Sequence, residues 1–402
     1  MEDRSDGRMN FREFYRVRAP DRWGGPPERF SHSTLARIES CPRKYQLEHA
    51  EFPVVGRYPS RPNGAAIEGS IVHECLELLF RGFSLAGLPE LGSEGARDCS
   101  RRINLIAVVA EKLQFFQEAL NRHPRGQGAT LRSSAQQIAN KVIQLFRQQY
   151  TQIDQSGVRS VAASEVLSPK TSVNPNSLLP VLDANGSLSE LRLSHPQLPF
   201  DGIIDLVYRG KDGTAIVDFK TGAEKQEHLD QAYRYALLWW RSTSEIPRSI
   251  EIRYLDRQLA SPISETRLIE VESSLAKEIS RATDSLGHTP AKAILGTHCH
   301  YCDVRQFCKD YWTRTSDSVT EGLRMADLEL SVMGQPSTTG FAAETSAGER
   351  VNVVFEPDIG TLLFPPLQDR QSFRVIGARF DPQKRSLLVL PSTEVWSVEP
   401  ES

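Results

Sequence analysis

Apolar residues recur at helical spacing through the first third of the chain. From Ser31, a serine cap and a short apolar stretch predict a helix that Pro42 breaks, with Cys41 at the break. Segments 67–81, 97–122 and 131–154 place apolar residues every three or four positions, which predicts further helices. We interpret residues 90–155 approximately as a helical insertion within a larger domain.

The pattern changes to short β-branched runs between residues 160 and 220. Runs at 158–166, 202–207 and 215–219 predict strands, and the turn residues 210–213 predict a hairpin between the last two. Residues 224–240 then return to helical spacing, and residues 249–254 predict another strand. This part of the chain is therefore expected to have a mixed α/β fold.

The two ends of the chain have different patterns. Residues 1–28 mix charges with proline and glycine and show no sustained period, so we expect a flexible arm. Five short apolar runs separated by turn residues predict a small antiparallel barrel or sandwich, which could be OB-like, near the other end: 328–332, 351–355, 361–364, 373–378 and 386–390. The expected domains are thus an arm (1–28), a central α/β domain (29–315) and a small β domain (316–402).

Composition narrows the class of protein. The 402 residues are 39% hydrophobic and 25% charged, with a mean hydropathy of −0.39, as in ordinary soluble globular proteins. No run approaches the ~18 apolar residues of a membrane span, and the first residues lack the pattern of a secretory signal. We therefore expect a cytoplasmic protein with no membrane contact, in which six cysteines are too few for a disulfide scaffold.

Charge is distributed unevenly along the chain. The net charge is −3, but residues 316–402 hold 7 Lys/Arg and 13 Asp/Glu, whereas the remaining 41 Lys/Arg and 38 Asp/Glu leave +3 for residues 1–315. A surface that binds phosphates is therefore expected within the first 315 residues. The acidic β region does not suit a groove for a nucleic-acid strand, and we favour a protein-docking or lid role for it.

Two predicted hairpin strands carry the residues with the clearest chemistry. Asp205 interrupts an apolar run, Asp218 ends the next strand, and Lys220 follows two positions later, on the same face of its strand. Two converging carboxylates can bind a hard divalent cation, and a nearby ammonium can orient or help to deprotonate a water molecule. Alone, the Asp218 and Lys220 pair would more often be a solvated surface pair, but a carboxylate within the apolar run around Asp205 is costly without a partner.

Four further residues could belong to the same site. Gln231 and Tyr235 lie four residues apart on the predicted helix 224–240, so both can hydrogen-bond on one side of it. His73 lies beside apolar helix residues and Glu165 in a preceding strand. Each of these is an ordinary helix, core or surface residue if considered alone, and each gains meaning only beside Asp205 and Asp218.

A second cluster has the spacing Cys299-x2-Cys302-x5-Cys308, with Cys41 as a distant candidate partner. Four thiolates suit an iron–sulfur cluster or a structural zinc, and either would join distant segments of the chain. The neighbouring His298 and His300 keep a Cys/His zinc site open.

In their order along the chain, these residues resemble the RecB-like branch of the PD-(D/E)XK nuclease superfamily, and its iron–sulfur members such as the AddB nuclease domain and CRISPR-associated RecB-type exonucleases. The resemblance covers approximately residues 30–80 and 160–310. It rests on Ser33-x-Leu35, the segment from Cys41 to Tyr45, Gly69-x3-His73, the segments 202–205 and 218–222, Gln231-x3-Tyr235 and the three later cysteines. It implies a restriction-endonuclease-like mixed sheet flanked by helices.

The resemblance also implies roles for the individual residues. His73, Asp205, Asp218 and the carbonyl of Phe219 would hold Mg²⁺ or Mn²⁺, and Lys220 would position the attacking water. Gln231 and Tyr235 would steady the active site and the DNA strand. A [4Fe-4S] cluster would be ligated by Cys41, Cys299, Cys302 and Cys308, chiefly with a structural role.

The predicted function is a metal-dependent DNA nuclease that acts on single-stranded DNA or DNA ends in repair, recombination or defence. Family members often work beside a helicase, so a helicase or another repair protein is a candidate partner. This chain contains no helicase motor, and its polarity and its endo- or exonuclease action stay open. The alternative is an inactive module that binds DNA ends or a partner and is stapled by an iron–sulfur cluster or zinc.

Overall fold

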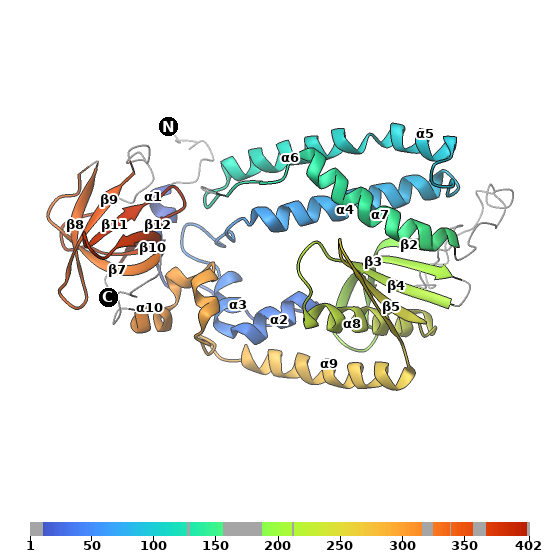
Figure 1. Ribbon diagram of the computed structural model, residues 1–402. Helices are drawn as coiled ribbons and strands as arrows, with labels where there is room; N and C mark the ends of the chain where they lie inside the picture. Colours follow the sequence, from blue (N-terminus) through green and yellow to red (C-terminus); the bar gives the residue numbers. More distant parts are fainter. Residues whose placement is uncertain are drawn as a thin grey trace, which may run out of the picture.

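The computed structural model describes residues 11–126, 129–155, 187–210, 213–315, 325–337, 339–356 and 367–399. An α/β body holds one sheet between two layers of helices, and a β-barrel lies beside it (Figure 1). The mixed α/β fold predicted from the sequence is confirmed. None of the helices in these ranges combines the length and the apolar character needed to cross a membrane.

The sheet of the α/β body has five strands in the order β2-β3-β4-β5-β6. The pair β4–β5 is parallel and the other three pairs are antiparallel. β4 is the most buried of the strands, since six of its seven residues are inaccessible to solvent. The strands are β2 (Ser187–Ser194), β3 (Asp201–Gly210), β4 (Gly213–Phe219), β5 (Ser249–Arg253) and β6 (Gln258–Pro262).

One face of this sheet is covered by α2 (His32–Ser40), α8 (Gln226–Thr243) and α9 (Glu265–Ser285). Ile204 and Ile216 of the sheet pack there against Trp239 of α8 and Leu268 of α9. The predicted helix broken at Pro42 is present as α2 followed by α3 (Pro42–Glu48), with Cys41 between them as the cap of both helices.

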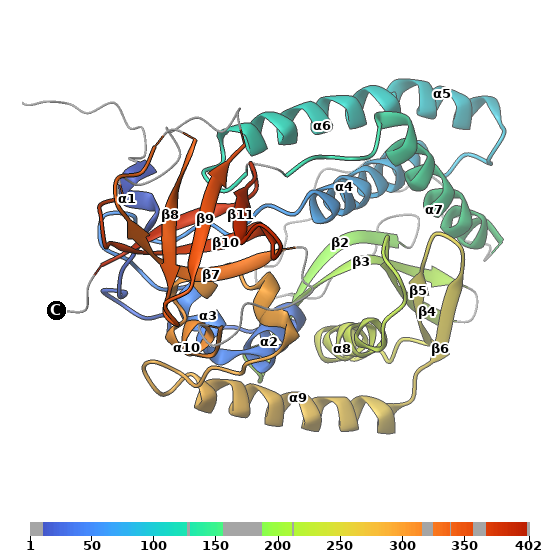
Figure 2. The ribbon, with the colours of Figure 1, turned by 60° about the vertical axis from the view of Figure 1, so that its left-hand side comes forward.

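Four helices cover the opposite face: α4 (Gly64–Leu85), α5 (Glu94–Ile103), α6 (Leu105–Arg122) and α7 (Ala135–Gln155). The helical pattern at 97–122 is divided in the structure because Asn104 has a left-handed backbone (φ 48°), which asparagine tolerates better than most residues. Figure 2 shows α4 and α7 next to the sheet and α5 and α6 farther out.

The region near the other end of the chain is a five-stranded barrel, followed by β12 (Glu394–Val398). Its strands are in the order β7-β8-β9-β11-β10, and β10 pairs again with β7 to close the ring. The OB-like assignment of this barrel stays a prediction, and the predicted run 361–364 lies outside the described residues. The barrel strands are β7 (Ala326–Met333), β8 (Gly340–Thr345), β9 (Arg350–Phe355), β10 (Ser372–Asp381) and β11 (Ser386–Val389).

The structure differs from the expectation of a flexible arm at residues 11–28, whereas residues 1–10 of this expected arm lie outside the described residues. From residue 11 the chain forms α1 (Phe11–Phe14) and β1 (Arg16–Val17), and β1 pairs in parallel with β12 of the barrel region. Phe14 is fully buried against Trp396 of β12. Burial of these aromatic rings, and not any local period, holds the segment in place. The same core includes the segment 299–312, with α10 (Lys309–Thr315) at its end, so the barrel and the α/β body share one apolar junction.

Candidate active site

Two carboxylates lie side by side where β3 and β4 run next to each other. Leu206 pairs with Val217 at the end of the β3–β4 register, and Asp205 and Asp218 adjoin this pair. The two carboxylates are close enough for the charge of Asp205 to act on Asp218. In addition, the Asp205 carboxylate accepts the backbone N–H of Phe219 at 2.7 Å. The structure therefore brings together the two acids that the sequence placed in separate runs.

Lys220 connects this acidic pair to α8. Its Nζ lies 2.8 Å from Oδ2 of Asp218 and donates a hydrogen bond to Oε1 of Gln231 at 2.9 Å. The Nε2 of Gln231 in turn donates to the hydroxyl of Tyr235 at 2.6 Å. Four of the predicted site residues thus form one continuous chain of polar contacts from the strand to the helix.

Gly202 on β3 allows α8 to lie this close to the sheet. A Cβ atom at this position would be 2.8 Å from carbon atoms of both Tyr235 and Leu238, which is closer than carbon atoms pack in proteins. Any larger residue would therefore displace the helix that carries Gln231 and Tyr235. Gly202, the first residue of the segment 202–205 on which the family resemblance partly rests, therefore also has a packing role.

His73 approaches the acids from the other layer of helices. It lies on α4, and its Nδ1 is 3.5 Å from Oδ2 of Asp205. Burial lowers the pKa of the imidazole, but the hydrogen bond to Asp205 and the charges of Asp205 and Asp218 outweigh burial, so the pKa is raised. The site is therefore lined by α4 on one side and by α8 on the other.

Asp218 is the most deeply buried member of the group, with 2% of its surface exposed. Burial, together with the charge of Asp205, raises its pKa to about 7, and the neighbouring Lys220 only partly offsets this. Within the described residues its Oδ2 accepts no well-aligned hydrogen bond, although the ammonium of Lys220 is close. The charge of Lys220 is therefore too small to offset burial and the charge of Asp205, and Asp218 ionises less readily than an exposed aspartate.

This shortage of positive charge fits a divalent cation. In the part of the chain that the structure describes, no group of three or more His, Cys, Asp and Glu side chains is arranged to hold a metal ion. Mg²⁺ does not need such a group, because it is usually bound by one or two carboxylates with water and substrate oxygens completing its shell. Asp205 and Asp218 are the carboxylates that could hold it here, with His73 adjacent to Asp205.

Two of the predicted site residues, one catalytic and one a metal ligand, need separate mention. Glu165 lies outside the described residues. Phe219 contributes its backbone N–H to Asp205, and the predicted role of its carbonyl in metal binding stays a prediction. The structure thus places every other predicted residue of this site in one cluster.

Two histidines that the sequence analysis did not select also lie at this site. Burial and the charges of Arg234 and Lys220 lower the pKa of His32 to about 4, and its Nδ1 has no hydrogen-bond partner within the described residues. His228 on α8 contacts the hydroxyl of Tyr254 at 2.8 Å, and burial followed by the charge of Lys220 lowers its pKa. Only the position of His32 between two serines at a helix start was a usable sequence signal.

The four cysteines of the second cluster line one small cavity. Cys41 lies at the junction of α2 and α3, where its Sγ accepts the N–H groups of Lys44 at 3.4 Å and Ile294 at 3.5 Å. Cys299 Sγ accepts a further backbone N–H, and burial raises the pKa of Cys302 to about 12. All four thiols are at least 90% buried: Cys41, Cys299, Cys302 and Cys308.

The two candidate zinc-ligand histidines behave differently. His298 lines the cavity and its Nε2 lies 3.0 Å from the carbonyl of Ile294. His300 is exposed and packs edge-on against Tyr311 instead. The segment that carries the cysteines is also attached to the barrel, because Arg305 forms an ion pair of 2.6 Å with Asp327 of β7.

A comparison with protein-family models matches residues 29–309 to a family described as "PD-(D/E)XK nuclease superfamily". The chain belongs to this superfamily. Its members are generally nucleases and typically use Mg²⁺ or Mn²⁺. The superfamily resemblance is therefore confirmed, and metal-dependent hydrolysis of nucleic acid is the activity that this membership supports. The match excludes the barrel strands.

Comparisons with individual proteins add little to the superfamily assignment. No curated protein matches the sequence. One of the solved structures that match in part is titled "Crystal structure of SSO0001". It is 14% identical, with a TM-score of 0.19, and the match covers 31% of this chain and 60% of that chain.

Proposed function

We propose that this PD-(D/E)XK protein is a deoxyribonuclease of the RecB-like iron–sulfur branch that cuts single-stranded DNA or DNA ends. The observation that carries the proposal is the pair Asp205 and Asp218 at one point of the sheet, with Lys220 2.8 Å from Asp218. Two neighbouring carboxylates, of which Asp218 is buried and paired with one lysine, form a donor set that a divalent cation can complete. We infer repair, recombination or defence as the setting, with a helicase or another repair protein as the partner.

Asp205 and Asp218 would hold Mg²⁺ or Mn²⁺, with His73 and the Phe219 carbonyl as further ligands. The bound cation would stabilise charge on the phosphate and favour deprotonation of the attacking water. Lys220 is held between Asp218 and Gln231, so its ammonium is directed at a fixed point where it can orient a water molecule or a phosphate oxygen. Tyr235 fixes the rotamer of Gln231 and therefore supports Lys220 indirectly.

We further propose a [4Fe-4S] cluster on Cys41, Cys299, Cys302 and Cys308. The support is the single cavity shared by four buried thiols and the backbone N–H groups directed at two of the sulfur atoms. A cluster there would join α3, the segment 299–308 and, through Arg305 and Asp327, the barrel. The role of such a cluster would be structural, because none of these cysteines belongs to the series of polar contacts that runs from Asp218 to Tyr235.

The decisive experiment uses anaerobically purified full-length protein with end-labelled single- and double-stranded DNA, in Mg²⁺ or Mn²⁺. Cleavage that is lost in Asp218→Ala and in Lys220→Ala, in variants that keep one cooperative thermal unfolding transition, supports the nuclease. An RNA strand of the same sequence tests the preference for DNA. Absence of cleavage by protein with a full iron and sulfide content contradicts the proposal and favours an inactive end-binding module.

The cluster is tested on the same preparation by metal analysis. Near four iron and four sulfide per chain, with visible absorption that Cys302→Ser and Cys41→Ser both remove, supports the cluster. One zinc per chain without sulfide contradicts it. This result is independent of cleavage, so the two parts of the proposal stand or fall separately.

A further inference from the structure

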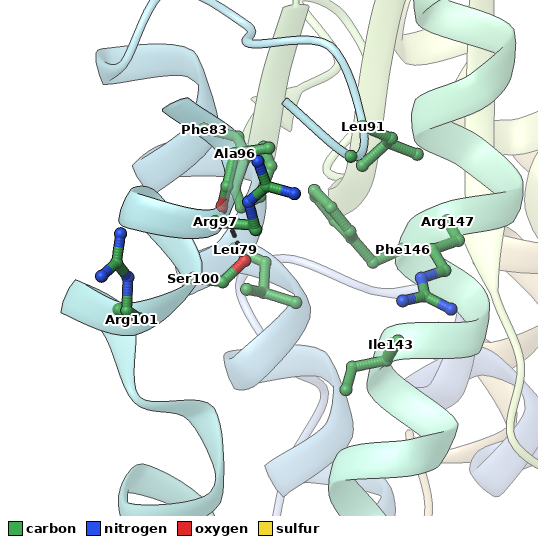
Figure 3. A pocket seen from close by; sticks show the side chains of 11 residues that line it. Leu79, Phe83, Leu91, Ala96, Arg97, Ser100, Arg101, Ile143, Phe146 and Arg147 are labelled. Atoms are coloured by element: carbon green, nitrogen blue, oxygen red, sulfur yellow. Dashed lines mark hydrogen bonds between the residues drawn. The ribbon is translucent and has the colours of Figure 1, made fainter. Parts of the chain in front are cut away.

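A large pocket lies in the helical layer, away from the candidate active site. It has a volume of about 910 Å³ and lies between α4, α5 and α7 (Figure 3). Its residues on α4 begin at Leu79, six positions after His73, which corresponds to about 9 Å along a helix. The family match and the catalytic residues give this pocket no role. Its volume is within the range of ligand sites in proteins, which are commonly ~300–1,000 Å³.

The charged residues of the pocket all have the same sign. Arg97 and Arg147 lie on opposite sides of it, and Arg101 lies at its edge (Figure 3). No acidic residue lines the pocket. Within the described residues, the side chains of Arg97 and Arg147 form no ion pair or hydrogen bond, and Arg101 only approaches Asp98 at 3.8 Å. A ligand with negative charge would find the two available guanidinium groups of Arg97 and Arg147, which are suited to carboxylates and phosphates.

The floor of the pocket is apolar, and its side chains show whether an acidic peptide or a nucleic-acid strand fits it better. Phe83 and Phe146 are 2% and 4% exposed, and their rings pack against each other with centroids 4.8 Å apart. Both also pack against Tyr150. Proteins that bind single strands stack bases on free aromatic faces, and these rings have none to offer. Aliphatic side chains complete the floor, namely Leu79, Leu91 and Ile143.

We propose that this pocket binds a short acidic peptide segment of a partner protein, with a large apolar side chain of the peptide inserted between Leu91 and Ile143. Carboxylates that flank this anchor would pair with Arg97 and Arg147. An apolar pocket with an arginine rim gives affinity through the anchor and orientation through the charges. The pocket would thus recruit the protein to a partner, while the catalytic residues on the sheet remain accessible.

The test is a titration of the full-length protein against a fluorescein-labelled peptide of four aspartates followed by leucine and phenylalanine, measured by fluorescence anisotropy. Three labelled controls accompany it: the same peptide with lysines for aspartates, the same peptide with serines for the two apolar residues, and a labelled oligothymidylate. The pocket variant is Arg97→Glu/Arg147→Glu. The matched variant is Arg102→Glu/Arg122→Glu, which reverses two exposed arginines of neighbouring helices that do not line the pocket.

We expect saturable binding of the acidic peptide that is weakened at least tenfold in the pocket variant and changes less than twofold in the matched variant. The lysine and serine peptides should bind at least tenfold more weakly. Equal loss in both variants, or equal binding of the serine peptide, overturns the proposal because the site would then be non-specific charge. Binding of oligothymidylate that only the pocket variant loses also overturns it, in favour of a DNA strand as the occupant.

Discussion

Two carboxylates in this protein, Asp218 on β4 and Glu394 on β12, are almost equally buried, with 2% and 6% of their surfaces exposed. Burial and the adjacent Asp205 raise the pKa of Asp218 to about 7. Burial acts in the same direction on Glu394, but the charges of Arg125 and Arg61 outweigh it and lower that pKa to about 2. Burial therefore disfavours the charged form of both carboxylates, but neighbouring cations outweigh this effect at Glu394 and not at Asp218.

The partners explain the difference. Glu394 forms two hydrogen bonds with Arg125, at 2.9 and 3.2 Å, and two with Arg61, at 3.0 and 2.8 Å, so two cations surround one acid. At the sheet, Asp218 has a single lysine, Lys220, as its cationic partner and a second acid, Asp205, as its neighbour. A carboxylate whose task is to join the barrel to the helical layer is neutralised by the protein itself. Asp218, which we propose as a metal ligand, lacks such neutralisation by the protein.

The largest expected difference between the two positions is in metal binding. Asp218→Asn keeps the size of the side chain but removes its charge, so we expect the affinity for Mn²⁺ to fall at least ~100-fold and cleavage at least ~10³-fold. Glu394→Gln removes the same charge from an equally buried position and should leave Mn²⁺ affinity within about twofold. Isothermal titration with Mn²⁺, followed by cleavage assays, measures both. Equal losses in the two variants would contradict the assignment of Asp218 as a ligand.

The second difference concerns stability. Glu394→Gln leaves the guanidiniums of Arg125 and Arg61 without their counter-charge, and breaking such a buried pair costs ~3–5 kcal/mol of unfolding free energy. Urea denaturation measures this cost. The matched variant is Glu349→Gln, whose ion pair with Arg385 is half exposed and should contribute less than about 1 kcal/mol. A similar small effect at both positions would show that the junction between barrel and helices does not depend on Glu394.

The third difference is one of pH, and it has opposite signs at the two positions. The folded-state pKa of Asp218 is raised, so metal-free protein should lose about 3 kcal/mol of stability relative to Asp218→Asn as the pH rises from about 4 to 7. The folded-state pKa of Glu394 is lowered, so its contribution is present above about pH 4.5 and is lost as the pH falls toward 2.

Urea unfolding of each variant beside wild type, in EDTA at several pH values, measures these two trends. Mn²⁺ should remove the loss at Asp218 and leave the trend at Glu394 unchanged, because only the folded site at Asp218 binds the cation. A pH profile for the Asp218 pair that is flat in EDTA would contradict the raised pKa.

The comparison of Asp218 with Glu394 also shows which contacts could be predicted from the sequence and which could not. Asp218, Lys220, Gln231 and Tyr235 lie within 18 residues of one another, and the periods of a strand and a helix are enough to place their side chains. Glu394 meets Arg125 across 269 positions and Arg61 across 333. No local pattern reports such a pairing, because it depends on how complete elements pack.

The same reason explains why the chain from residue 11 onward is ordered where a flexible arm was expected. Phe14 and the short strand β1 are ordered by Trp396 and β12, which lie almost at the other end of the sequence. A run of mixed charges with proline gives no sign of this contact. The four cysteines lie between these two cases. Three of them share one short segment, which the sequence shows directly, and only Cys41 reaches their cavity through a long-range contact.

The smallest effect is expected one step away from the acids, where Gln231 holds Lys220 toward Asp218. Gln231→Ala removes this support but leaves the ion pair, so we expect cleavage to fall roughly tenfold, as is common for groups that orient a catalytic residue, with Mn²⁺ affinity within about twofold. Tyr233→Phe is the matched control. Tyr233 lies on the same helix, but its hydroxyl contacts Ser261 of β6 and does not belong to the chain of contacts from Asp218 to Tyr235. If Gln231→Ala weakened Mn²⁺ binding as much as Asp218→Asn, Gln231 would act on the metal site itself, and the division between ligands and positioning residues would have to be redrawn.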